Sequence, residues 1–155
     1  MTNMPESVAA FLKGRRFAVA GVSRQPGQSA NAIYRRLKQS GYEVYPVNPR
    51  AAQVEGTTCY PDVGAVPGRL DGVVIATAPA ASAEVVHQCA SHGVPGVWFH
   101  RSFGAGSVSD EAVRACQARG IASIVGGCPL MFCEPVDIGH RCMRWWLQRQ
   151  GRVPR

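Results

Sequence analysis

The sequence lacks any uninterrupted apolar stretch of about 18 residues, which a membrane-spanning helix would require. Its start also lacks a basic segment followed by an apolar one, the pattern of a secretory signal peptide. We therefore expect a cytoplasmic protein without a membrane partner. Its 155 residues, 46% of them hydrophobic, suffice for a domain with its own core. We expect one domain over residues 1–155.

Acidic side chains are scarce: 10 Asp and Glu against 17 Lys and Arg give a net charge of +7. Residues 140–155 contain five arginines and no acid. Such a segment could contact nucleic acid, a membrane or an anionic ligand. Aromatic and basic residues are not interleaved elsewhere, as they are in single-strand binders. We expect a solvated C-terminal helix and no nucleic-acid partner.

Short apolar runs alternate with helical patterns along the chain. The runs predict strands over residues 16–21, 43–47, 72–76, 96–99 and 121–125, with a further short strand over 57–60. The helical patterns lie over residues 1–13, 30–40, 82–92, 109–119 and 137–150. This alternation predicts an α/β fold, a Rossmann-like open parallel sheet with helices on both faces.

In such sheets, ligands bind outside the carboxyl ends of the strands. In the loop after the first strand, Gly21 allows a phosphate to approach the backbone, and the following helix directs its first N–H groups at an anion. Ser23, Ser29 and Asn31 can add hydrogen bonds, and Arg24 adds charge. An ordinary strand–helix turn would have a similar composition, so the loop alone leaves both interpretations open.

The chain lacks the G-x-G-x-x-G turn of dinucleotide sites, because Gly21 and Gly27 are six residues apart. It also lacks an acid after the second strand, where NAD sites bind the ribose hydroxyls. In this chain Arg50 follows the second strand instead. Its guanidinium could pair with a phosphorylated ribose, as in NADP or coenzyme A, or Arg50 could simply be an exposed surface residue. The small residues 77–79 after the strand over 72–76 would let a slender ligand pass close to the edge of the sheet.

Four segments together resemble the coenzyme-A-binding domain family: FAVAGVSR (17–24), GYEVYPVNP (41–49), GTTCYP (56–61) and LDGVVIATAP (70–79). The resemblance covers roughly residues 10–130. This Rossmann-like domain occurs at the N-terminus of succinyl-CoA synthetase α-subunits and as small stand-alone bacterial proteins. The ligase also uses a second domain with a phosphorylated histidine and a partner subunit, for which this chain is too short. The resemblance therefore implies binding of coenzyme A or an acyl-CoA without ligase activity.

The resemblance also implies roles for particular residues. The pyrophosphate would lie against Gly21, Val22, Ser23 and Arg24. The adenosine and its 3′-phosphate would lie by Asn48, Pro49 and Arg50. The exit for pantetheine would be lined by Thr77, Ala78 and Pro79.

The loop after the fifth predicted strand contains His100, Arg101, Ser102, Gly104 and Gly106. A histidine in such a turn can contact a ligand, act as an acid or base, or be structural. No acid close in sequence would orient His100, so we assign it to ligand binding. No complete catalytic set is visible, and an NADP-dependent oxidoreductase, the enzyme alternative, lacks an evident hydride-site acid.

The six cysteines are not expected to form disulfides in a cytoplasmic chain. Cys128, Cys133, His140 and Cys142 could instead make a metal or redox site, the alternative of an adaptor protein. On a helix His140 and Cys142 would point apart. We therefore expect a buried thiol cluster under the last helix, and Cys128 facing a bound thiol is a further option. Cys89 and Cys116 read as small buried hydrophobes.

The last helix carries Ile138, Cys142, Trp145, Trp146 and Leu147. This apolar face predicts either packing on the core or contact with a second copy in a homodimer.

Overall fold

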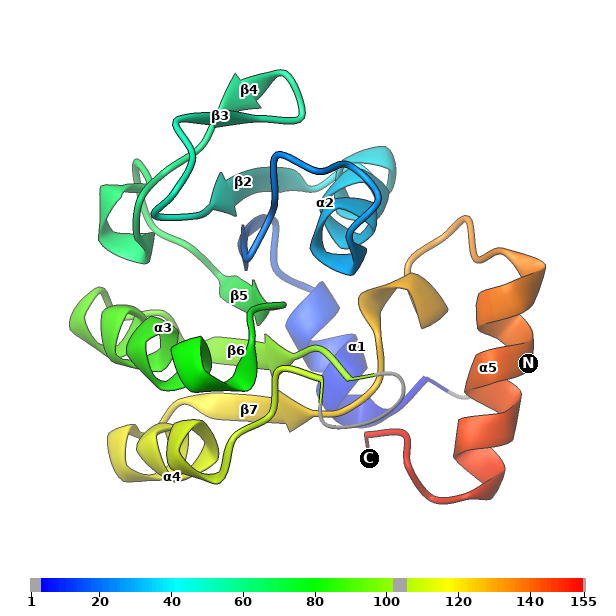
Figure 1. The fold of residues 1–155 in the computed structure, drawn as a ribbon. Helices are drawn as coiled ribbons and strands as arrows, with labels where there is room; N and C mark the ends of the chain where they lie inside the picture. Colours follow the sequence, from blue (N-terminus) through cyan, green and yellow to red (C-terminus); the bar gives the residue numbers. More distant parts are fainter. Residues whose placement is uncertain (1–3, 102–105, 155) are drawn as a thin grey trace.

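The computed structural model describes residues 4–101 and 106–154. Its main sheet has five parallel strands in the order β2-β1-β5-β6-β7 (Figure 1). The strands are β1 (Arg16–Ala20), β2 (Glu43–Val47), β5 (Gly72–Ile75), β6 (Gly96–Phe99) and β7 (Ala122–Val125). Strands β5 and β6 are buried along their whole length, as expected of parallel strands covered on both faces. The predicted Rossmann-like α/β fold is confirmed.

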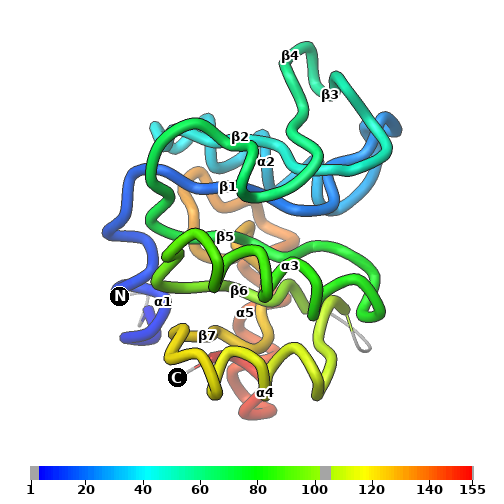
Figure 2. Tube along the Cα trace, turned by 90° about the vertical axis from the view of Figure 1, so that its left-hand side faces the viewer, coloured from blue at the N-terminus to red at the C-terminus, as the bar shows by residue number. Residues whose placement is uncertain are grey.

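Side chains alternate between the two faces of the sheet, because successive residues of a strand point in opposite directions. On one face Val19, Val74 and Trp98 join a core with α1 (Glu6–Leu12), α2 (Ser29–Gln39) and α5 (Ile138–Arg149). On the other face, Val73 and Val97 pack with α3 (Pro79–Ser91) and α4 (Asp110–Arg119). The molecule thus has three layers, and Figure 2 shows α3 and α4 in front of the sheet.

The strand predicted over residues 57–60 is wrong as a member of the main sheet. Strands β3 (Gln53–Val54) and β4 (Thr57–Thr58) form a separate antiparallel hairpin. Its turn places Glu55 and Gly56 at φ 51° and 72°, the left-handed conformation that a two-residue hairpin turn needs at both positions. Tyr60 makes only an isolated bridge to Val47.

The helix predicted over residues 1–13 occupies Glu6–Leu12, and residues 1–3 lie outside the described part of the chain. Two short 3-10 helices, η1 (Val63–Ala65) and η2 (Pro129–Met131), were not predicted. None of the helices formed by residues 4–101 and 106–154 is long and apolar enough to cross a membrane.

Of the two interpretations of the apolar face of α5, packing on the core holds for Leu147 but not for the other large apolar residues of that face. Leu147 is buried, with 1% of its surface exposed. Ile138, Trp145 and Trp146 are 79%, 55% and 47% exposed. The core-facing side of the helix is instead the side that carries Leu147 and the partly buried Met143.

Candidate functional site

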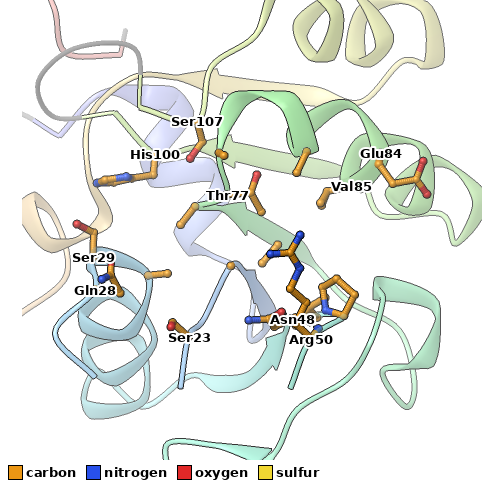
Figure 3. Close-up of a pocket in the computed structure, with 18 of the residues that line it drawn as sticks. Ser23, Gln28, Ser29, Asn48, Arg50, Thr77, Glu84, Val85, His100 and Ser107 are labelled. Atoms are coloured by element: carbon orange, nitrogen blue, oxygen red, sulfur yellow. Dashed lines mark hydrogen bonds between the residues drawn. The ribbon is translucent and has the colours of Figure 1, made fainter. Parts of the chain in front are cut away.

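The candidate site lies where the strand order reverses. Strand β1 pairs with β2 on one side and with β5 on the other, so the loops after β1 and β5 diverge to opposite halves of the sheet. Ligands of open α/β sheets bind at this position. A cavity of about 950 Å³ opens here, lined by the loops after β1, β2, β5 and β6 and by α3 (Figure 3).

Gly21 brings the first loop against the end of β5. Its N–H donates to the Val47 carbonyl at 2.9 Å, and its φ is +103°. A Cβ at this position would lie 2.5 Å from the carbonyl oxygen of Ala76, a contact that real Cβ atoms do not make. Only glycine satisfies both constraints, so the backbone itself forms the floor of the cavity between β1 and β5.

The buried Asn31 holds the first loop in shape. Its amide nitrogen donates to the Ser23 carbonyl at 2.7 Å, and its amide oxygen accepts from the Ser23 N–H at 2.9 Å. The amide nitrogen also donates to Glu55 at 2.9 Å, and Glu55 pairs with Arg35 at 2.5 Å. Asn31 therefore does not line the cavity, where the sequence suggested a ligand contact; it fixes Ser23, which does.

Helices α2 and α3 both begin at the cavity without a side-chain cap. The residues before them, Gln28 and Ala78, line the cavity and accept no capping hydrogen bond. In contrast, Ser109 caps α4 and Asp137 caps α5 with their side chains. Two sets of helix N–H groups, each with the positive end of a helix dipole, therefore face the cavity and favour an anion there.

One end of the cavity combines a cation with polar groups. The side chain of Asn48 accepts from the Arg50 N–H at 2.9 Å and donates to the Val22 carbonyl at 2.8 Å, which joins the loops after β1 and β2. The guanidinium of Arg50 extends into the cavity (Figure 3). Glu84 and Gln88 of α3 line the same cavity, and their side chains hydrogen-bond at 3.3 Å.

Glu84 and Gln88 were not predicted from the sequence, because ligand contacts were expected only at the strand ends. Their spacing of four residues, which puts both on one face of a helix, was the available signal. Gln28, Pro61, Ala81, Val85 and Ser107 line the cavity as well and were also missed.

The other end of the cavity is formed by His100, Ser29 and Ser107 (Figure 3). The His100 N–H donates to the Ile75 carbonyl at 2.9 Å, and its carbonyl accepts from the Ser107 N–H at 2.8 Å. The buried Ser82 hydroxyl donates to the Ser107 carbonyl at 2.6 Å and so fixes this loop to α3. Burial, with a smaller effect of the nearby His140, lowers the pKa of His100 and favours its neutral imidazole.

Nine of the twelve predicted site residues line the cavity: Gly21, Ser23, Ser29, Asn48, Pro49, Arg50, Thr77, Ala78 and His100. Val22 is instead buried in the core, Arg24 is exposed, and Pro79 begins α3 without lining the cavity. Ser102 and Gly104, considered from sequence, lie outside the described residues.

The cysteines are free thiols among the described residues. Burial raises the pKa of Cys89 to about 12 and that of Cys116 to about 11, which confirms both as buried hydrophobes. Cys128 and Cys133 are buried, but Cys142 is exposed, so the thiol cluster predicted under the last helix contains only two of its three members. Cys128 does not line the cavity, which leaves the option of a contact with a bound thiol without support.

His140 is not oriented towards these thiols. Its Nδ1 lies 2.6 Å from a carboxylate oxygen of Asp137, one turn earlier. Within residues 4–101 and 106–154 no group of three His, Cys, Asp or Glu side chains is placed to hold a metal ion.

Comparison with known proteins gives the family. A family model described as CoA binding domain matches residues 15–134. The chain belongs to this family. Acetate–CoA ligase (ADP-forming) II subunit alpha of Pyrococcus furiosus is 31% identical to this CoA binding domain over 105 residues, 67% of the chain. Acetate–CoA ligase (ADP-forming) II of Archaeoglobus fulgidus is 37% identical over 81 residues, 51% of the chain. These matches span only 23% and 12% of the two relatives.

Solved structures agree with the fold of this CoA binding domain. A hypothetical protein from Pyrococcus horikoshii OT3 superposes with a TM-score of 0.72 at 26% identity, covering 83% of this chain and 93% of that one. Dinucleotide-forming acetyl-coenzyme A synthetase 1 of Ca. Korarchaeum cryptofilum, in complex with phosphate and ADP, gives a TM-score of 0.60 at 31% identity. That match covers 74% of this chain and 25% of the synthetase chain.

Proposed function

We propose that the chain is a one-domain cytoplasmic protein that binds coenzyme A or an acyl-CoA in the cavity at the carboxyl ends of the strands, without ligase chemistry of its own. The observation that carries the proposal is Arg50 at the end of β2, its side chain in the same cavity as the unblocked starts of α2 and α3. Coenzyme A carries a pyrophosphate and a separate ribose phosphate, which match two anion-binding positions.

The pyrophosphate is assigned to Gly21, Ser23 and the start of α2, where backbone N–H groups and a hydroxyl are available. A charged phosphate close to Arg50 can accept paired hydrogen bonds from the guanidinium.

The 3′-phosphate is assigned to Arg50, with Asn48 and Pro49 beside the adenosine. Pantetheine would then pass the small residues Thr77 and Ala78 and reach the end of the cavity formed by His100. A neutral imidazole suits this position, because the thiol or thioester there is uncharged.

The test is calorimetric titration of the chain, freed of bound ligand, with coenzyme A, acetyl-CoA, dephospho-CoA and NADP. We expect micromolar binding of coenzyme A and little response to NADP. Arg50→Glu should weaken coenzyme A about 10- to 100-fold, the value of a charge-assisted hydrogen bond, and should affect dephospho-CoA much less.

Arg114→Glu is the matched control, since it makes the same charge reversal on the exposed face of α4, away from the cavity. It should leave all four titrations unchanged. Equal loss of coenzyme A and dephospho-CoA in Arg50→Glu would remove Arg50 from the phosphate site. A folded chain that binds none of the four ligands would refute the proposed function.

A further inference from the structure

Helix α5 turns an apolar stripe away from the protein. Ile138, Cys142, Trp145 and Arg149 follow one another at spacings of four, three and four residues, which places them on one face of the helix. All four are exposed, whereas Leu147, on the opposite face, is buried against the core. Figure 1 shows α5 at the outer edge of the molecule, and the exposed fractions of Ile138 and Trp145 put the stripe on the side of the helix away from the core.

The stripe is large for an exposed surface. Trp145 and Trp146 leave 55% and 47% of their surface exposed, and Ile138 leaves 79%. With about 250 Å² for a tryptophan, the two tryptophans expose roughly 250 Å² of mainly apolar surface, and Ile138 adds to it. The Arg149 guanidinium lies 4.1 Å from the centroid of the Trp145 ring, so part of the stripe is already ordered. The largest apolar patch of a typical monomer covers about 300–600 Å² and is often an interaction site, and tryptophan is enriched at such sites.

The charges at the two ends of α5 have opposite sign. Glu134 lies exposed at its start beside Asp137, which also pairs with Arg36 and His140, and Arg149 and Arg152 lie exposed at its end. Two copies of the helix packed antiparallel bring the acidic end of each against the basic end of the other, twice. A parallel arrangement would instead place like charges together.

We propose that the outward stripe of α5 is the contact surface for a second copy of this chain, with the two α5 helices antiparallel across a two-fold axis. Spacings of four and three residues are those of a two-helix seam, with Cys142 and Trp145 at its centre. Each Trp145–Arg149 stack then packs beside the start of the partner helix. The match to the CoA binding domain family ends at residue 134, before this helix, so the proposal does not depend on ligand binding.

The size of the contact sets its strength. The 12 residues of α5 extend about 18 Å, and one such helix pair buries well under the roughly 800 Å² per partner of a standard interface. We therefore expect a dimer in equilibrium with monomer at micromolar concentration. A bilayer with anionic lipids would match the arginines and tryptophans but would repel the acidic start of the same helix.

The test is sedimentation equilibrium of the full chain from about 1 to about 500 µM. We expect the mass to rise from monomer to dimer over this range. Trp145→Ala should weaken dimerisation at least about tenfold, as for a central interface tryptophan. Gln150→Ala, at the exposed C-cap of α5 and outside the stripe, is the matched control and should dimerise as the wild type does. At about 1 µM, where all three chains are expected to be monomeric, both variants should keep the wild-type melting temperature.

A charge exchange tests the antiparallel arrangement. Arg152→Glu should weaken the dimer by facing Glu134 of the other copy, and the double variant Glu134→Arg with Arg152→Glu should recover most of the loss. A wild-type chain that stays monomeric at about 500 µM overturns the proposal. A double variant that dimerises no better than Arg152→Glu also overturns it. The proposal is overturned as well if monomers bind phosphatidylglycerol vesicles and Trp145→Ala abolishes that binding.

Discussion

Replacing Gly21 by alanine should destabilise the fold strongly, since this one position combines an unfavourable backbone angle with a backbone clash. At φ +103°, an alanine costs about 1–3 kcal/mol in conformational strain. Its Cβ would also meet the Ala76 carbonyl oxygen at 2.5 Å and its carbon at 2.8 Å. Relieving such an overlap in a packed region costs a further 1–3 kcal/mol or so.

The total of about 2–6 kcal/mol is a large part of the ~5–15 kcal/mol that stabilises a typical domain. The assay is urea unfolding followed by circular dichroism, in which the midpoint should fall while the slope with denaturant stays the same. A chain of this size should also melt roughly 5–20 °C earlier.

Gly27→Ala is the matched control, six residues further along the same loop. No atom lies within 4 Å of a Cβ built at Gly27, and its φ lies outside the left-handed region. We expect no loss of stability, or a gain of a few tenths of a kcal/mol from the less flexible unfolded chain. If Gly21→Ala unfolds within about 0.5 kcal/mol of the wild type, the contact with Ala76 does not constrain the switch point as argued.

Two further predictions concern titrating groups. At pH 8 and below about 1 µM, where the chain is expected to be monomeric, iodoacetamide should modify the native chain at Cys142 alone. Cys142 is exposed, whereas burial raises the pKa of Cys89 to about 12 and shields the other thiols. Mass spectrometry that finds two or more modified cysteines before unfolding would contradict this. The N–H groups of Arg15 and Arg16 donate to Asp71 at 2.8 and 2.9 Å and lower its pKa, so the stability that this carboxylate contributes is present at neutral pH and lost as the pH falls below its ordinary value of 3.8. In Asp71→Asn the free energy of unfolding should therefore fall less between about pH 5 and pH 2.5 than in the wild type, measured by urea unfolding. The same fall in both proteins would show that other groups cause the acid sensitivity.

The parallel sheet was predictable because its central strands β1, β5 and β6 are buried on both faces, and all five strands are short, mainly apolar runs between turn residues. The hairpin at residues 53–58 was not recognised, although Glu55-Gly56 is a two-residue sequence compatible with such a turn. Its strands are only two residues long, too short for any hydrophobic period to appear.

The lining residues of the cavity that follow the strand ends could be predicted, because the fold brings these ends together at one edge of the sheet. The direction in which individual side chains point could not be predicted. Asn31 was expected to reach the ligand, but the turn of α2 directs its amide at Ser23 and Glu55. Likewise, the periodicity of α5 defines an apolar stripe without saying which side of the helix meets the core, and the side with Leu147 does so.

The missing side-chain caps of α2 and α3 connect the stability of the empty protein to its occupancy. A Ser, Asp or Asn at the position of Gln28 or Ala78 would typically stabilise its helix by about 1 kcal/mol. The same side chain would occupy the N–H groups that an anion would use, and an aspartate would repel that anion. The chain forgoes this local stabilisation at two helices whose starts line the cavity, and a bound phosphate can supply it from outside. If the proposed ligand binds there, resistance to unfolding and to proteolysis should follow its concentration, and the abundance of the folded protein would report on the supply of that ligand.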